Sequence, residues 1–132
     1  MKRSFQVIMA VMLTIQVCAS CDDIFERDIS GEQVEIIAPS DGMVVMEGMV
    51  TFSWNVLRGA EFYRLVVVGP SFDKAMSALC DEVIIADSAA MSCSHTFFLT
   101  AGNCQWTLQG VNSIGSSKRI VYGLSVKESD DN

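Results

Sequence analysis

The sequence has few of the side chains that catalysis and metal binding require. It contains one histidine, His95, and the cysteines that follow residue 21 show no CxxC spacing. Metal sites need clustered ligands, and an activated nucleophile needs a base beside it. No G-x-S-x-G motif occurs, and Asp81 and Glu82 would point to opposite faces of a strand. We therefore expect no catalytic residues, no metal site and no cofactor.

Basic residues are also scarce. The chain has 9 Lys and Arg against 16 Asp and Glu, which gives a formal net charge of −7. Nucleic-acid binding depends on a basic footprint, and so does peripheral attachment to anionic lipid. The composition therefore excludes nucleic acid as a partner, and it excludes attachment to a membrane through surface charge.

The longest apolar run lies near the start of the chain and is too short to span a bilayer. Phe5 to Val17 follows the basic residues Lys2 and Arg3, whereas a transmembrane helix takes about 20 residues. This layout is typical of a secretory signal peptide. We assign residues 1–20 to it, so that the mature chain begins at Cys21.

The residues around the cleavage site favour a lipid anchor. Ala19 and Ser20 are small and directly precede Cys21, and this resembles the lipobox of bacterial lipoproteins, although Cys18 stands where leucine is more common. The resemblance implies that Cys21 carries lipid and attaches the protein to a membrane. An ordinary signal peptide followed by a chance cysteine is the alternative.

Residues 21–33 are polar and acidic, and they indicate a tether between the lipid and the domain. Asp22 and Asp23 directly follow Cys21, which resembles the export signal of surface lipoproteins from gut-dwelling Gram-negative anaerobes. The resemblance implies display on the outer face of the outer membrane. A solvated linker without a signal is the alternative, and in other bacteria an aspartate here implies retention at the inner membrane.

Residues 34–127 show the pattern of an all-β domain, and residues 128–132 form a polar tail. Short runs with period-two alternation are separated by turn residues such as Pro39 and Gly59. The pattern predicts seven strands in an antiparallel β-sandwich. The expected strands are Val34–Ile37, Met49–Val56, Phe62–Gly69, Glu82–Ala86, Ser94–Leu99, Cys104–Val111 and Ser117–Val126.

Four segments resemble fibronectin type III-like domains by their order and spacing. They are residues 51–54, 59–65, 99–106 and 111–113, with sequences TFSW, GAEFYRL, LTAGNCQW and VNS. The resemblance covers most of the mature chain and is closest to small surface lipoproteins of the same anaerobes. It implies a β-sandwich of the immunoglobulin or fibronectin type III-like class. Cys104 departs from it, because the family usually has tyrosine there as a corner that fixes a loop.

Cys80, Cys93 and Cys104 cannot all pair with one another. In the expected fold, Cys93 and Cys104 start successive antiparallel strands and therefore lie at opposite ends of the domain. A disulfide needs Cα atoms within about 7 Å. Cys80, just before its strand, should lie at the same end of the domain as Cys104. Cys80–Cys104 is therefore the only disulfide that we consider, and the alternative is that all three are buried free thiols.

Aromatic side chains offer the remaining route to a function. Phe72 is expected in a long loop, and Phe98 follows Phe97 directly, so one of these two must face outward from a strand. Phe72 and Phe98 are our candidate ligand contacts. Met43, Met46 and Met49 recur every third residue, and we expect them to fill one end of the core.

The sequence as a whole predicts a surface binding module without catalysis, whose ligand is an envelope protein, a host protein or a glycan. The alternative is a structural accessory of an envelope assembly with no ligand of its own, and a hydrolase fragment is a weaker third reading. A binding module should expose an apolar patch, whereas a structural accessory should expose an edge strand suited to pairing. An enzyme should show a pocket that holds His95 and a carboxylate.

Overall fold

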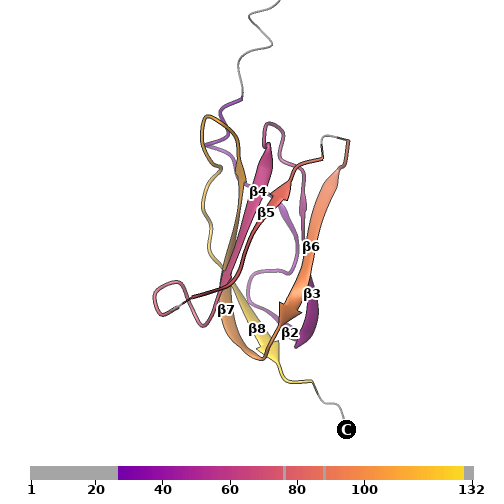
Figure 1. Ribbon diagram of the computed structural model, residues 1–132, viewed down its shortest axis with the longest axis vertical. Coiled ribbons are helices and arrows are strands. Elements are labelled where there is room, and N and C mark those ends of the chain that lie inside the picture. Colours follow the sequence, from indigo (N-terminus) through magenta and orange to yellow (C-terminus); the bar gives the residue numbers. More distant parts are fainter. Residues whose placement is uncertain (1–26, 76, 88, 130–132) are drawn as a thin grey trace, which may run out of the picture.

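The structure is a computed structural model that describes residues 27–75, 77–87 and 89–129. These residues form eight strands in two sheets, and no helix occurs among them. The two sheets face each other as a sandwich whose strands follow its long axis (Figure 1). The predicted all-β sandwich is therefore confirmed.

The smaller sheet has the order β1-β3-β6, with each pair antiparallel. Its members are β1 (Ile36–Ala38), β3 (Gly48–Asn55) and β6 (Ser92–Leu99). The register between β3 and β6 is unbroken, from Gly48 opposite Leu99 to Asn55 opposite Ser92. The pair β1–β3, by contrast, contains an irregularity between Ile36 and Ala38.

The larger sheet has the order β2-β8-β7-β4-β5. Its members are β2 (Met43–Met46), β8 (Tyr122–Lys127), β7 (Gly102–Val111), β4 (Phe62–Val68) and β5 (Ala78–Ile85). All pairs are antiparallel except β2–β8, which is parallel. β5 is therefore one edge of this sheet, and β2 is the other.

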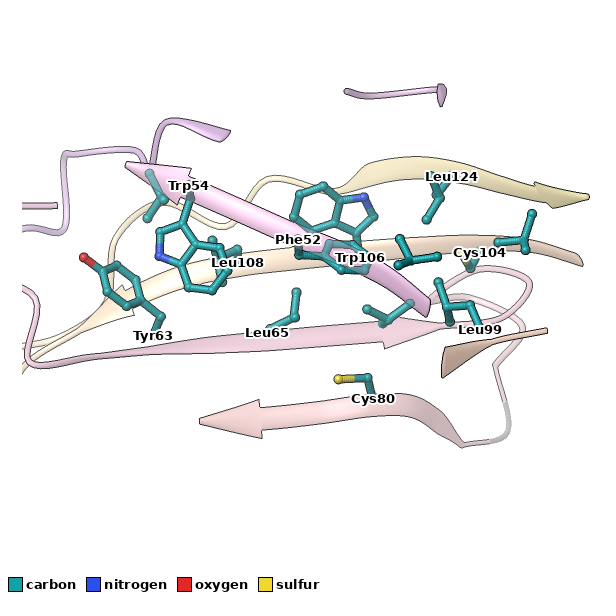
Figure 2. Close-up of a cluster of buried hydrophobic side chains, with 14 residues drawn as sticks. Phe52, Trp54, Tyr63, Leu65, Cys80, Leu99, Cys104, Trp106, Leu108 and Leu124 are labelled. Carbon is teal, nitrogen blue, oxygen red and sulfur yellow. The ribbon is translucent and has the colours of Figure 1, made fainter. Parts of the chain in front are cut away.

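The core lies between the sheets and is built mainly from large aromatic and aliphatic side chains (Figure 2). The ring centroids of Phe52 and Trp106 lie 4.9 Å apart, and those of Trp54 and Tyr63 lie 5.4 Å apart, both pairs in an edge-to-face arrangement. Such pairs stabilise a fold by about 0.5–1.5 kcal/mol beyond the burial of their area. The inward positions predicted from alternation are confirmed as buried at Phe52, Trp54, Tyr63, Leu65, Val67, Trp106 and Leu108.

The number and bounds of the strands differ from the prediction. There are eight strands, because Met43–Met46 adds a short parallel strand that the sequence pattern did not predict. β5 begins at Ala78 instead of Glu82, since the backbone from Ala78 onward pairs with β4. β8 begins at Tyr122, five residues after the predicted start at Ser117. Because β2 and β8 are parallel, the larger sheet is not purely antiparallel.

The predicted boundary between tether and domain at residue 34 is also wrong, because residues 27–33 pack against the sandwich. Ile29 has no exposed surface. A Cβ on Gly59 would lie 3.1 Å from the side chains of both Arg27 and Ile29, so the N-terminal segment crosses closely over the β3–β4 loop. Asn112 holds this segment by donating from its side-chain nitrogen to the Arg27 carbonyl at 2.7 Å.

The two ends of the sandwich are distinct. The described chain enters beside the β3–β4 loop, where Arg27 and Gly59 share the Asn112 amide. It leaves at the opposite end, where the Glu47 amide donates to the Lys127 carbonyl, and Figure 1 shows these ends at the top and bottom of the view. We call them the N-terminal end and the far end.

Candidate binding surface

An exposed apolar surface lies at the far end of the sandwich, and it begins with Met49 and Phe98. Their neighbours Val50 and Leu99 are buried, so strand alternation turns Met49 and Phe98 outward. The two residues stand directly opposite each other in the β3–β6 register. Met49 is 68% exposed and Phe98 is 61% exposed. This is the outward aromatic that the pair Phe97–Phe98 predicted.

The methionines of β2 continue this surface. A groove of about 340 Å³ is lined by Ala38, Pro39, Met43, Val45, Met46, Met49, Val50 and Thr51. Met43 and Met46 are each about half exposed. We call Met43, Met46, Met49 and Phe98 the methionine surface. The expectation that the three methionines fill the core is wrong, because β2 is an edge strand and Met49 lies on the outer face of β3.

Electrostatics set the character of this surface. The strands β1, β3 and β6 contain no Asp, Glu, Lys or Arg. Glu47 directly follows Met46 in the sequence, and its carboxylate accepts hydrogen bonds from the backbone amides of Ala101 and Ser129. Methionine side chains are flexible and polarisable, so they adapt to apolar partners of varied shape. The methionine surface is therefore suited to apolar side chains or rings, with the exposed Lys127 of β8 at its border, opposite Met46.

Two other hollows occur in the described part of the chain. One of about 440 Å³ lies at the N-terminal end and is lined by the β3–β4 loop and by Ala86 and Asp87. The Tyr63 hydroxyl accepts a hydrogen bond from the Leu57 amide beneath this loop, and burial raises the pKa of Tyr63. The other, of about 300 Å³, lies between the loops that follow β4 and β6.

His95 lines none of these three hollows. It is half-buried on β6, with its ring 6.0 Å from the ring of Phe97. No group of three or more His, Cys, Asp or Glu residues suited to a metal occurs among the described residues. The expectation that the protein has no catalytic residues stays a prediction.

Phe72, the other candidate ligand contact, is engaged with its own chain. Its ring lies 4.7 Å from the guanidinium carbon of Arg119, and its backbone amide donates to the Gln105 side chain. Phe72 lies in the β4–β5 loop and Phe98 on β6, and they line no hollow together. Of the two candidates, only Phe98 belongs to the apolar surface.

The disulfide considered between Cys80 and Cys104 is not formed, and Cys93 is also a free thiol. β4 lies between β5 and β7 (Figure 2). Two strand spacings of about 4.8 Å therefore separate the cysteines, which exceeds the span of a disulfide. Burial, followed by the charges of Glu82 and Asp81, raises the pKa of Cys80 to about 11. Burial also raises the pKa of Cys104.

Several predicted features lie outside the described residues. They are the signal peptide at 1–20, the lipidation site Cys21, the export signal at Asp22 and Asp23, and the last three residues of the tail. Within the described ranges, we find no helix of the length and apolarity that a membrane crossing would need.

Sequence reasoning missed β2 and with it most of the groove. The signal that could have found it is the run Met43-Val44-Val45-Met46 between Gly42 and Gly48, which is a short apolar strand bounded by turn residues. Both glycines have positive φ, 79° and 130°, so each turns the chain at one end of β2.

Comparisons with known proteins give distant structural likeness only. No family model matches the chain, and no curated protein matches it. A solved structure described as "Structure of FN3tt mut" has a TM-score of 0.39 and 18% identity, and the match covers 74% of this chain and 100% of that chain. For "Crystal Structure of FN3tt" the TM-score is 0.40 and the identity 16%, with coverage of 73% and 90%. Both neighbours are FN3-type domains, and a likeness this distant concerns the fold alone.

Proposed function

We propose that this protein is a lipid-anchored binding module, displayed at the cell surface, that holds an apolar segment of a partner on its methionine surface. The observation that carries the proposal is the position of that surface. It lies at the far end of the sandwich, whereas the chain enters at the N-terminal end. Lipid on Cys21 would therefore direct Met49 and Phe98 away from the membrane, toward partners in solution.

The chemistry of the surface favours a protein ligand over a glycan. Methionine and phenylalanine side chains supply apolar contact area, and β2, β3 and β6, the strands that carry them, contain no Asp, Glu, Lys or Arg. A sugar face could stack on the ring of Phe98. Sugar-binding sites, however, also use directional polar side chains, and among the residues lining the groove only Thr51 has a polar side chain. We therefore place an apolar peptide segment of an envelope or host protein first.

The binding surface is tested with a double variant, Met49→Gln and Phe98→Ser, in the full chain. Partners retained by the wild-type protein from solubilised outer membrane and from host mucus are identified, and their affinities are then measured. Both side chains are more than half exposed, so the fold should persist. We expect affinity to fall at least about tenfold, as for the loss of a central apolar contact.

The matched control is Val83→Gln with Ile85→Ser, which removes two exposed apolar side chains from β5. This control should bind as the wild type does. If both double variants bind equally well, or if no partner is retained by the wild type, the methionine surface is not a ligand site.

The anchor is tested separately with Cys21→Ser. We expect the variant to lose fatty-acid labelling and to leave the membrane fraction, since the two or three acyl chains of a lipoprotein supply the membrane affinity. A variant that remains membrane-bound and unlabelled would refute lipid anchoring while leaving the ligand surface untouched.

A structural accessory in an envelope assembly is the second candidate. The observation that favours it is the strand β6, which forms one edge of the smaller sheet along its whole length. A surface-exposed edge of this kind suits pairing with another strand.

A further inference from the structure

In the described residues the two sheets have four edge strands, and three of these carry features that discourage pairing. β1 is three residues long, is irregular, and is followed by Pro39. β2 has only four residues. β5 carries the adjacent acidic residues Asp81 and Glu82. Short length, irregularity, proline and charge are the usual means by which natural sheets protect their edges.

β6 has none of these features. Its eight residues, Ser-Cys-Ser-His-Thr-Phe-Phe-Leu, include no Pro, Gly, Asp, Glu, Lys or Arg, and its pairing with β3 is regular throughout. Within the described ranges, no strand pairs with its free side. Its inward residues Cys93, His95 and Phe97 remain only half-buried at this edge. An unprotected strand with half-covered inward side chains indicates a pairing site.

We propose that β6 pairs antiparallel with β6 of a second copy of this chain, joining the two smaller sheets into one six-stranded sheet. Charge permits a second copy as the occupant, and the mutual cover of the half-buried inward side chains of the two β6 strands favours it. The chain is acidic, so two copies repel wherever their charges meet, but β1, β3 and β6 are free of charged residues. The edge of the smaller sheet is therefore where two such acidic molecules approach with the least repulsion.

Strand geometry limits the register. Directly opposite residues on antiparallel strands point to the same face, so even-numbered residues of β6 must oppose even-numbered ones. A register centred on Thr96 places each Cys93 opposite Leu99 and each His95 opposite Phe97, which covers the half-buried inward side chains. A register centred on His95 would instead oppose two imidazoles, so we choose the one centred on Thr96.

This register gives a charge test. The two Thr96 side chains would lie about 5 Å apart on the outer face, where both point to solvent. Thr96→Lys and Thr96→Glu should each weaken the dimer at least about tenfold, because like charges stand directly opposite. An equimolar mixture of the two variants should recover a heterodimer at about the wild-type affinity.

Thr51→Lys is the matched control. Thr51 lies opposite Thr96 on β3, and their hydroxyls share one hydrogen bond of 2.7 Å, so either substitution removes the same bond. In the dimer, three strand spacings would separate the two Thr51 side chains, about 14 Å. This exceeds the Debye length of about 8 Å at physiological salt. Thr51→Lys should therefore dimerise as the wild type does.

The measurement is sedimentation equilibrium of the full chain in detergent, over a range of protein concentrations with micelles in excess. Circular dichroism confirms that each variant is folded. The proposal is overturned if the wild type is monomeric throughout, if the Thr96 variants dimerise normally, if Thr51→Lys is equally weakened, or if the mixture recovers nothing. No ligand is used, so these outcomes are independent of the function proposed for the methionine surface.

Discussion

Replacing Asn112 with alanine should destabilise the domain more than any other change outside the hydrophobic core that we consider. The Asn112 side chain is buried and makes four hydrogen bonds. Its nitrogen donates to the carbonyls of Arg27 and Gly59 at 2.7 and 3.0 Å. Its oxygen accepts from the amides of Ile114 and Gly115 at 3.0 and 3.2 Å. One side chain thus joins the N-terminal segment, the β3–β4 loop and the turn after β7.

The size of the effect follows from these four bonds. A hydrogen bond within a protein contributes about 0.5–1.5 kcal/mol net. Ile114 lies in an exposed turn, so water can accept the hydrogen bond from its amide once Asn112→Ala has removed the side-chain oxygen. We expect a loss of about 2–3 kcal/mol in the free energy of unfolding, and a fall in melting temperature of roughly 10 °C or more for a domain of this size.

The assay is urea unfolding followed by tryptophan fluorescence, because Trp54 and Trp106 are both buried. Asn103→Ala is the matched control. Its side chain is exposed and makes one hydrogen bond, to the Ser125 hydroxyl, so its loss should cost less than about 0.5 kcal/mol. If the variants at Asn112 and Asn103 unfold at the same urea concentration, residues 27–33 are not held to the sandwich as we describe.

Two further predictions concern titratable groups. Arg64 donates two hydrogen bonds to Asp81, which holds the pKa of the Asp81 carboxyl below its ordinary value. The stability from this pair is therefore present above the unfolded-state pKa and is lost as the pH falls through the folded-state pKa. Both side chains are about half exposed. Asp81→Asn should therefore lower the free energy of unfolding by less than about 1 kcal/mol at pH 7 and leave it unchanged at pH 2, as measured by thermal unfolding. An equal loss at both pH values would contradict the ion pair. The Cys80 thiol, with its pKa raised to about 11, should react with iodoacetamide at pH 8 about 100-fold more slowly than an unperturbed thiol. Peptide mass mapping that shows Cys80 labelled as fast as free cysteine in the same reaction would refute its burial.

The inward faces of β3, β4 and β7 could be predicted from the sequence. Alternation identified Phe52 and Trp54 on one strand, and Leu65 and Val67 on another, because residues two apart on a strand share a face. The same rule required one of Phe97 and Phe98 to face outward, and the structure shows that it is Phe98. These features depend only on local backbone geometry and on the need to bury large apolar side chains.

Other features depended on contacts between segments far apart in the sequence. Ile29 stands alone among polar residues, and nothing local indicates that the β3–β4 loop covers it. The three methionines are apolar and were expected in the core, but β2 pairs with β8 and forms the edge of the larger sheet, which leaves Met43 and Met46 half exposed. Burial at such positions depends on which strand lies alongside, and periodicity carries no information about that.

The sequence by itself thus determined the β-sandwich class, the inward residues of β3, β4 and β7 and the acidic character of the chain, because each follows from composition or from period-two alternation. Only the tertiary structure decided that β4 separates Cys80 from Cys104, that Met49 and Phe98 share the far end, and that β6 is an unprotected edge. The physical reason is that strand order and register are set by the packing of the whole core, which no single segment encodes.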